Sequence, residues 1–197
     1  IRVLGSWTRR LRQLAEKESE VSFLMEGPYG RNAVDIDNYE RYKMALFFSG
    51  GIGVTPMYSI ANTLMHQVEQ GGRRNMKKLR FVWGIRNMDL YHAMTDYPYE
   101  RDLCGPTILD HRRQQSNSVM DLDIYLTGND TTSDYENNPL KPKLGRPNID
   151  KIFHQMKEGA VKEGETSVVV FACGPSALMD SVRDACRRHS GSRVGFD

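Results

Sequence analysis

The stretch FFSGGIGVTP, residues 47–56, joins an apolar run to three glycines and a Thr-Pro pair. Glycine lets a backbone approach another group closely because it carries no Cβ. Thr55 is suited to cap a following helix, and Pro56 fits the first turn of that helix. The free N–H groups and the positive end of the helix dipole favour an anion. The stretch predicts a strand, a phosphate-binding turn and a helix; the alternative is a glycine turn needed only for a tight connection.

Strand and helix patterns alternate along the chain around this stretch. Near-continuous apolar runs are typical of parallel strands, and a 3.6-residue period is typical of helices. The predicted strands are residues 43–50, 79–86, 122–128 and 167–174, with a fifth at 192–197. The predicted helices are residues 55–72, 148–159 and 175–189, and 89–102 with Pro98 interrupting or ending it. This order predicts the α/β class, with a doubly wound, mostly parallel five-stranded sheet.

The first thirty residues do not follow this alternation. Residues 1–5 and 21–27 have strand patterns, and a helix that starts at Ser6 or Thr8 is expected between them. We interpret residues 1–30 as the end of a preceding domain with a hinge at 27–30, and residues 31–197 as the sheet domain. Residues 129–147 predict a long polar loop, functional or mobile. The chain is therefore expected to be a piece of a longer protein.

Composition excludes several function classes. The chain has 197 residues and a net charge of +2, from 27 basic and 25 acidic residues, which does not favour nucleic-acid binding. Three cysteines without a CxxC pair predict free thiols in a reducing compartment. No run approaches the roughly 18 apolar residues of a membrane helix. The five histidines have no ligand spacing, so no metal site is expected.

The last residue of the second predicted strand bears on cofactor choice. NADP sites place an arginine there for the 2′-phosphate, whereas NAD sites place an acid for the ribose hydroxyl. Arg86 occupies this position, and its guanidinium can grip a phosphate in bidentate fashion. Asp89 leaves an NAD site open, and a surface ion pair is the plain alternative for Arg86. The glycine stretch reads GxGxxP rather than GxGxxG, which argues against a dehydrogenase-type Rossmann domain.

Six short motifs follow one another along the chain in this order: GPYG, SGGIGVTP, WGIR, YLTG, LGRPN and ACGP. In this order they resemble the NAD(P)-binding half of the ferredoxin–NADP reductase superfamily, and more closely the dehydrogenase region of NADPH oxidases and ferric reductases. IRVLGSWTRRL is similar to the end of that family's flavin domain. The resemblance implies a ferredoxin-reductase-like NAD(P)-binding domain after a short remnant of a flavin-binding β-barrel. The family's own flavin motif, haem-bearing helices and final aromatic segment are absent from the chain.

The resemblance also implies site residues. The NADPH pyrophosphate would be held by Gly50, Gly51, Gly53, Val54, Thr55 and Pro56. Arg86 and Arg146, with Pro147 beside it, would hold the 2′-phosphate. Cys173, Gly174 and Pro175 would lie beside the nicotinamide, with Cys173 in the catalytic centre to orient the ring rather than as a nucleophile; a buried core cysteine is the alternative. Trp7 and Thr8 would lie near the FAD pyrophosphate. No metal ligand is implied.

The implied activity is NADPH oxidation by a membrane flavocytochrome. A hydride would pass from NADPH to FAD, held mainly by a missing domain, and single electrons would pass through haem in the parent protein to oxygen, giving superoxide. The alternatives are a ferric-chelate reductase, a soluble ferredoxin- or flavodoxin-type reductase, and a non-enzymatic nucleotide-sensing docking domain. The expected partners are the FAD and haem domains of the same chain and regulatory proteins, at the cytosolic face of a membrane. This segment itself is expected to be soluble and inactive alone.

Overall fold

The structure is a computed structural model that describes residues 3, 5–17, 20, 22, 24, 26, 41–95, 107–109, 119–128 and 141–197. The chain divides into two compact units, Ile1–Asp35 and Ile36–Asp197. Residues 27–40, where the predicted hinge and domain boundary fall, lie outside the described residues. The predicted domain limits therefore stay predictions.

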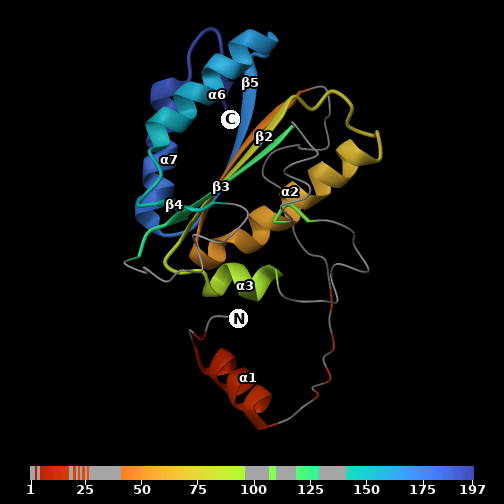
Figure 1. Cartoon of the computed structure of the whole chain (residues 1–197), viewed down its shortest axis with the longest axis vertical. Helices are drawn as coiled ribbons and strands as arrows, with labels where there is room; N and C mark the ends of the chain where they lie inside the picture. Colours follow the sequence, from red (N-terminus) through yellow and green to blue (C-terminus); the bar gives the residue numbers. More distant parts are fainter. Residues whose placement is uncertain are drawn as a thin grey trace. The chain divides into compact units, whose positions relative to one another are not determined.

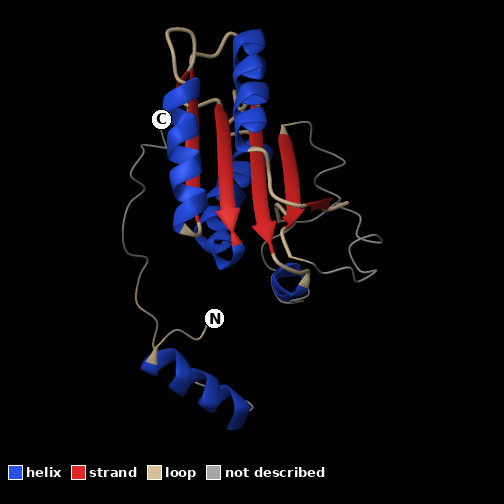
Figure 2. Ribbon diagram, turned by 90° about the vertical axis from the view of Figure 1, so that its left-hand side faces the viewer, coloured by secondary structure: helices blue, strands red, loops and turns tan. Residues whose placement is uncertain are grey.

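The larger unit is built on one six-stranded sheet with the order β4-β3-β2-β1-β5-β6. All neighbouring strands pair in parallel, and Figure 2 shows the long strands pointing the same way. The strands are β1 Met44–Gly50, β2 Lys78–Ile85, β3 Met120–Leu126, β4 Lys143–Leu144, β5 Ser167–Cys173 and β6 Gly195–Phe196. This confirms the predicted class and parallel sheet, with the predicted C-terminal strand as β6.

The predicted strand count was one short. Strand β4 falls inside residues 129–147, which the sequence predicted as a loop, and pairs with Tyr125 and Leu126 at the edge of the sheet. A two-residue strand shows no periodicity, so its pairing depends on the neighbouring strand rather than on its own sequence. Residues 129–140 of the predicted loop lie outside the described residues.

Helices cover both faces of the sheet, as doubly wound folds require. Helices α6 (Ile149–Glu163) and α7 (Ser176–His189) lie on one face, and α2 (Val54–Glu69) lies on the other (Figure 1). Helix α3 (Asp89–Thr95) follows β2. Residues 96–102 of the predicted third helix lie outside the described residues.

Helix α6 runs past its predicted end at Gly159. Gly159 lies inside the helix near β1, where a Cβ on it would make an ordinary contact with the Met44 methyl at 3.7 Å. The helix ends instead at Gly164, whose φ of 72° is the left-handed conformation that favours glycine. An apolar period alone could not distinguish these two glycines.

The core has two apolar layers, one on each face of β1. Toward α6, Phe48 stacks on Phe153 with ring centroids 5.7 Å apart. On the opposite face, Phe47 stacks between Phe81 and Phe171 at 5.6 and 5.0 Å. Side chains alternate along a strand, so these two layers bury both faces of the central strand.

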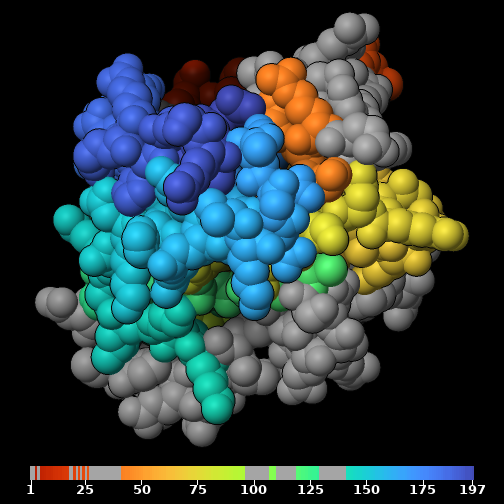
Figure 3. Space-filling view, turned by 90° about the horizontal axis from the view of Figure 1, so that it is seen from above, coloured from red at the N-terminus to blue at the C-terminus, as the bar shows by residue number. Residues whose placement is uncertain are grey.

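Strands β2 and β3 differ from β1, since part of their α6 side is polar. Lys78 and Arg80 of β2 alternate with buried Leu79 and Phe81. Asp121 and Asp123 alternate in the same way along β3. This polar side was not expected from the near-continuous apolar runs of β2 and β3, although Val82 of β2 does lie in the core that contains Phe153. Figure 3, seen from above, shows teal and blue residues of α6, β5 and α7 on one side and the yellow α2–β2 turn on the other.

The N-terminal unit contains helix α1, Ser6–Lys17, close to the predicted helix. Its start is held by Thr8, whose Oγ1 accepts from the Gly5 N–H at 3.0 Å and lies 3.1 Å from the Gly5 carbonyl. Helix α1 has no buried residue, and Trp7 is 66% exposed. The strands predicted at residues 1–5 and 21–27 lie largely outside the described residues.

Candidate functional site

The glycine turn after β1 packs directly on the segment after β5. A Cβ on Gly53 would stand 2.4 Å from the Cys173 carbonyl oxygen, and a Cβ on Gly50 would stand 2.6 Å from Pro175 Cδ. A Cβ on Gly174 would stand 3.0 Å from the Gly50 Cα. Gly50 and Gly53 therefore allow the turn to pack closely on the segment after β5. That packing brings together the two predicted cofactor segments.

Gly51 has a different role from its neighbours. Its φ of +53° favours glycine, and a Cβ there would meet nothing within 4 Å. Its carbonyl oxygen accepts a hydrogen bond from the indole Nε1 of Trp83 at 3.0 Å. The turn is thus open on one side and anchored to β2 on the other.

The helix N-termini at this edge of the sheet differ in how they are capped. Helix α2 begins after Gly53 and α7 after Pro175; neither cap residue offers a side-chain hydrogen bond, and neither helix has an acid in its first turn. In contrast, Asn148 caps α6 by accepting from the Lys151 N–H, and Asp150 lies in the first turn of that helix. The positive ends of α2 and α7 are therefore not compensated by such groups, which favours an anion at the ends of β1 and β5.

Thr55 does not cap α2 as predicted. The helix begins at Val54, so Thr55 already lies inside the first turn, where its hydroxyl donates to the Ile52 carbonyl at 2.7 Å. The predicted place of Pro56 in the first turn is confirmed. The Thr55 side chain is exposed, and its hydroxyl oxygen can still accept a hydrogen bond.

The carboxyl ends of β2, β3 and β4 are tied together beside this turn. Thr127 donates to the Ile85 carbonyl through its N–H at 2.7 Å and its hydroxyl at 3.0 Å. Gly128 lies against the backbone of Arg86, since a Cβ there would be 2.3 Å from the Arg86 carbonyl oxygen. The Gly145 N–H donates to the Leu126 carbonyl at 2.8 Å. These contacts fix the backbone from which two predicted arginines project.

Arg86 is the first residue after β2, and Arg146 is the second residue after β4. Their strands flank β3, so the two backbones lie about 10 Å apart at a spacing of roughly 4.8 Å per strand. Both side chains are exposed, and within the described part of the chain neither forms an ion pair. Asp89 begins α3, and its carboxylate accepts from Asn87 Nδ2 at 2.6 Å. The edge therefore offers two guanidinium groups that can converge on one anion.

Three register partners lie near the carboxyl ends of the central strands: Ser49 of β1, Trp83 of β2 and Cys173 of β5. Paired residues of parallel strands share a face, so these three side chains lie on the α2 side. Ser49 is 2% exposed, and its hydroxyl has no hydrogen-bond partner among the described residues. Cys173 is a half-buried free thiol at the end of its strand rather than a fully buried core cysteine.

The remaining predicted residues fall into two groups. Pro147 is half-buried between Arg146 and the α6 cap. Trp7 and Thr8 belong to the N-terminal unit, so their assignment to FAD stays a prediction. Among the residues that the structure describes, no group of three or more His, Cys, Asp or Glu residues could hold a metal ion. None of the described helices is long and apolar enough to cross a bilayer.

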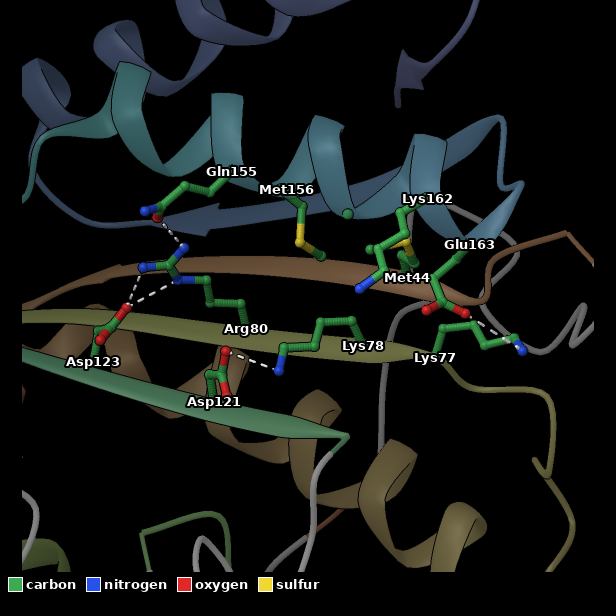
Figure 4. Close-up of a pocket in the computed structure, with 11 residues that line it drawn as sticks. Met44, Lys77, Lys78, Arg80, Asp121, Asp123, Gln155, Met156, Lys162 and Glu163 are labelled. Atoms are coloured by element: carbon green, nitrogen blue, oxygen red, sulfur yellow. Dashed lines mark hydrogen bonds and ion pairs between the residues drawn. The ribbon is translucent and has the colours of Figure 1, made fainter.

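A cavity of about 570 Å³ lies away from this edge, between α6 and the polar sides of β2 and β3 (Figure 4). Arg80 donates to Asp123 at 2.7 Å and to Gln155 at 2.8 Å. Lys78 pairs with Asp121 at 2.9 Å. Most of the charged groups that line this cavity are therefore paired with one another, and they cover the polar sides of β2 and β3.

The matches with known proteins agree with the geometry of the sheet edge. Residues 42–144 and 140–187 match the ferric reductase NAD-binding domain family. The chain belongs to this family. Among its relatives are a superoxide-generating NADPH oxidase heavy chain of Dictyostelium discoideum, 25% identical over 97% of this chain, and NADPH oxidase 4 of Rattus norvegicus, 26% identical over 100% of it. Dual oxidase 2 of Homo sapiens is 24% identical over 95% of this chain.

The chain spans 30%, 35% and 13% of those three relatives. The family and the sheet confirm the NAD-binding domain that the motifs indicated. Two residues at this edge were given no individual role from the sequence: Trp83, and Gly128 of the YLTG motif, which brings the β3 end against Arg86. Trp83 could have been noticed as an indole two residues from the end of a strand beside the glycine turn.

Proposed function

We propose that the carboxyl edge of the sheet binds NADPH. The pyrophosphate would lie at the turn of Gly50, Gly51 and Gly53 and the first turn of α2, formed by Val54, Thr55 and Pro56. The 2′-phosphate would lie between Arg86 and Arg146, with Pro147 fixing the backbone after Arg146. The nicotinamide would lie beside Cys173, Gly174 and Pro175. The edge between β1 and β5 is also where the chain reverses direction across the sheet, the usual ligand position in open α/β folds.

The residues present fit such a dinucleotide. Gly51 leaves open space on one side of the turn, and two helix N-termini without capping side chains face the same edge. The observation that carries the proposal is that Arg86 and Arg146 are exposed at the ends of β2 and β4 without an ion-pair partner among the described residues. Two guanidinium groups favour a phosphate over the ribose hydroxyl of NADH.

Bound NADPH supplies a hydride from the nicotinamide, and this chain supplies its position. Hydride transfer needs the reacting atoms within about 3–3.5 Å, so holding the nicotinamide in place is the main task of the protein. The half-buried Cys173 would act in the catalytic centre by shaping the pocket and orienting the ring. The close packing of the turn on the Cys173–Pro175 segment would hold the pyrophosphate and nicotinamide sites at a fixed separation.

Within a longer protein, this domain would serve a membrane NADPH oxidase. FAD on a neighbouring domain would accept the hydride, and haem in a membrane domain would pass single electrons to oxygen, giving superoxide. The names of the relatives, which are NADPH oxidases and a dual oxidase, support this assignment. The domain would then lie at the cytosolic face of the membrane, with Trp7 and Thr8 near the FAD. Regulatory proteins are further proposed partners.

A ferric-chelate reductase is the second candidate, because the matched family is described by ferric reductases. Both candidates need the same NADPH site, so one experiment tests their shared step. The chain would be fused to the flavin domain of an NADPH oxidase and assayed for dye reduction with NADPH and with NADH. We expect NADPH-driven reduction; a fusion that holds FAD but does not oxidise NADPH would contradict the proposal. Full-length protein supplied with oxygen or a ferric chelate would then separate the two acceptors.

A further inference from the structure

Trp83 makes a contact that the proposed function leaves unused. Its side chain is fully buried at 0% exposure, and its indole ring packs against Tyr91 with centroids 6.5 Å apart. The indole N–H nevertheless has a partner, the Gly51 carbonyl oxygen at 3.0 Å. A buried indole N–H needs such a partner, so the packing of the ring and the position of the turn are linked.

The Gly51 carbonyl accepts two hydrogen bonds, from Trp83 and from the Val54 N–H at the start of α2. Its direction is therefore fixed toward the interior of the domain. In a trans peptide unit the carbonyl and the following N–H point in opposite directions. The Ile52 N–H, in the same peptide unit, must then point away from Trp83. The Ile52 side chain is 42% exposed, and the neighbouring Gly51 faces open space.

We propose that Trp83 is a positioning residue that aims the Ile52 backbone N–H at the pyrophosphate of the bound dinucleotide. Resting on the proposed NADPH site, this inference names the donor within it and the side chain that orients that donor. Without the indole N–H, the Gly51–Ile52 peptide loses one of the two hydrogen bonds that set its direction. A glycine next to the peptide makes rotation easy, since glycine adopts positive and negative φ with similar ease.

The test replaces the indole N–H without changing ring shape, by incorporating 3-benzothienyl-L-alanine at position 83, with Trp83→Phe as a second variant. Affinities are measured for NADPH, for inorganic pyrophosphate and for adenosine 2′-monophosphate, which lacks the pyrophosphate. The Ile52 amide resonance is followed during the pyrophosphate titration. Tyr42→Phe is the control, because it removes another buried aromatic hydrogen bond, from Tyr42 to Asp197 at 3.2 Å, near the amino end of β1.

We expect the Ile52 amide of the unsubstituted protein to shift on adding pyrophosphate. Both position-83 variants should bind NADPH and pyrophosphate about tenfold more weakly, as for one lost charge-assisted hydrogen bond, and adenosine 2′-monophosphate within about twofold of normal. Tyr42→Phe should leave all three affinities unchanged. A silent Ile52 amide, unchanged pyrophosphate binding in the benzothienyl variant, or equal losses for all ligands would overturn the inference while NADPH binding stands. Failure of the unsubstituted protein to bind NADPH would instead overturn the proposed function as well.

Discussion

Gly53 lies so close to Cys173 that a Cβ on Gly53 would stand 2.4 Å from the Cys173 carbonyl oxygen. The clashing atom belongs to the backbone and cannot swing aside, so Gly53→Ala must push the turn away from β5. We expect the free energy of unfolding to fall by about 2 kcal/mol, within the usual range for overpacking, and NADPH binding to weaken. Urea unfolding measures the first effect, and ligand titration the second.

Gly72→Ala is the matched control for Gly53→Ala. A Cβ on Gly72 would meet the Gln67 carbonyl at 3.6 Å, an ordinary contact. Its free energy of unfolding should stay within about 0.5 kcal/mol of the unsubstituted protein. Equal stability of the two alanine variants would mean that the turn and the β5 segment are not in close contact.

Arg86→Ala and Arg146→Ala should each weaken NADPH far more than NADH. Each removes a charge-assisted contact to the 2′-phosphate, which costs about 1.5–3 kcal/mol or roughly ten- to a hundredfold in affinity. NADH lacks that phosphate, so its affinity should change by less than about threefold. Arg183→Ala, which removes an exposed arginine paired with Asp180 at 2.8 Å, is the control. Equal losses for both nucleotides would refute the assignment of the two arginines.

The lowered pKa of Asp123 predicts that the stability of the fold depends on pH. Burial raises the pKa of this carboxyl, but hydrogen bonds from Lys143 and Arg80 outweigh burial and hold it below its ordinary value of 3.8. A carboxyl with a lowered folded-state pKa stabilises the fold above its unfolded pKa, and this contribution is lost as pH falls through the folded pKa. Asp123→Asn should therefore cost about 1.5–3 kcal/mol at pH 7 and progressively less below about pH 4.

Asp121→Asn tests the same strand and the same kind of pair at a more exposed site. The Asp121 side chain is 51% exposed, against 12% for Asp123. Solvent screens its pair with Lys78, so the variant should lose no more than about 1 kcal/mol at pH 7. Urea unfolding of both variants between pH 7 and pH 3 checks this. If both lost the same free energy at pH 7, burial would not be what makes the Asp123 cluster strong.

Ser49→Ala should not destabilise the protein. The Ser49 hydroxyl is buried and has no partner among the described residues, and an unsatisfied buried polar group costs free energy. We expect the free energy of unfolding to stay the same or to rise by up to about 1 kcal/mol in thermal or urea unfolding. A larger loss than about 1 kcal/mol would show that the hydroxyl has a stabilising partner in the folded protein.

The sequence predicted the sheet well where patterns are strong. The apolar runs around Phe47, Phe81 and Phe171 are long and are bounded by glycine or arginine. The carboxyl ends of the four long strands, which carry the candidate site, were predicted to within two residues. Gly159 and Gly164 show the limit of such patterns, because α6 continues through the first and ends at the second, whose φ is 72°. Strand β4 was missed because two residues carry no period.

The candidate site was predictable in its parts and not in its connections. Glycines in a strand–turn–helix unit and an arginine after a strand are local signals. The contact of Gly53 with Cys173 and the hydrogen bond from Trp83 to Gly51 join residues far apart in the chain. No local pattern reports such pairs, since strand order determines which ends meet. For the same reason, the close packing of Gly53 on the β5 segment was not predicted beside its proposed role in ligand approach.

A crystal structure of the protein grown with saturating NADPH would show whether this edge of the sheet is the nucleotide site. We expect the pyrophosphate within hydrogen-bond distance of the Ile52 N–H, the 2′-phosphate between Arg86 and Arg146, and the nicotinamide beside Cys173. Density for the nucleotide at another place, such as the cavity between α6 and the polar sides of β2 and β3, or no density at this edge, would refute the proposed NADPH site.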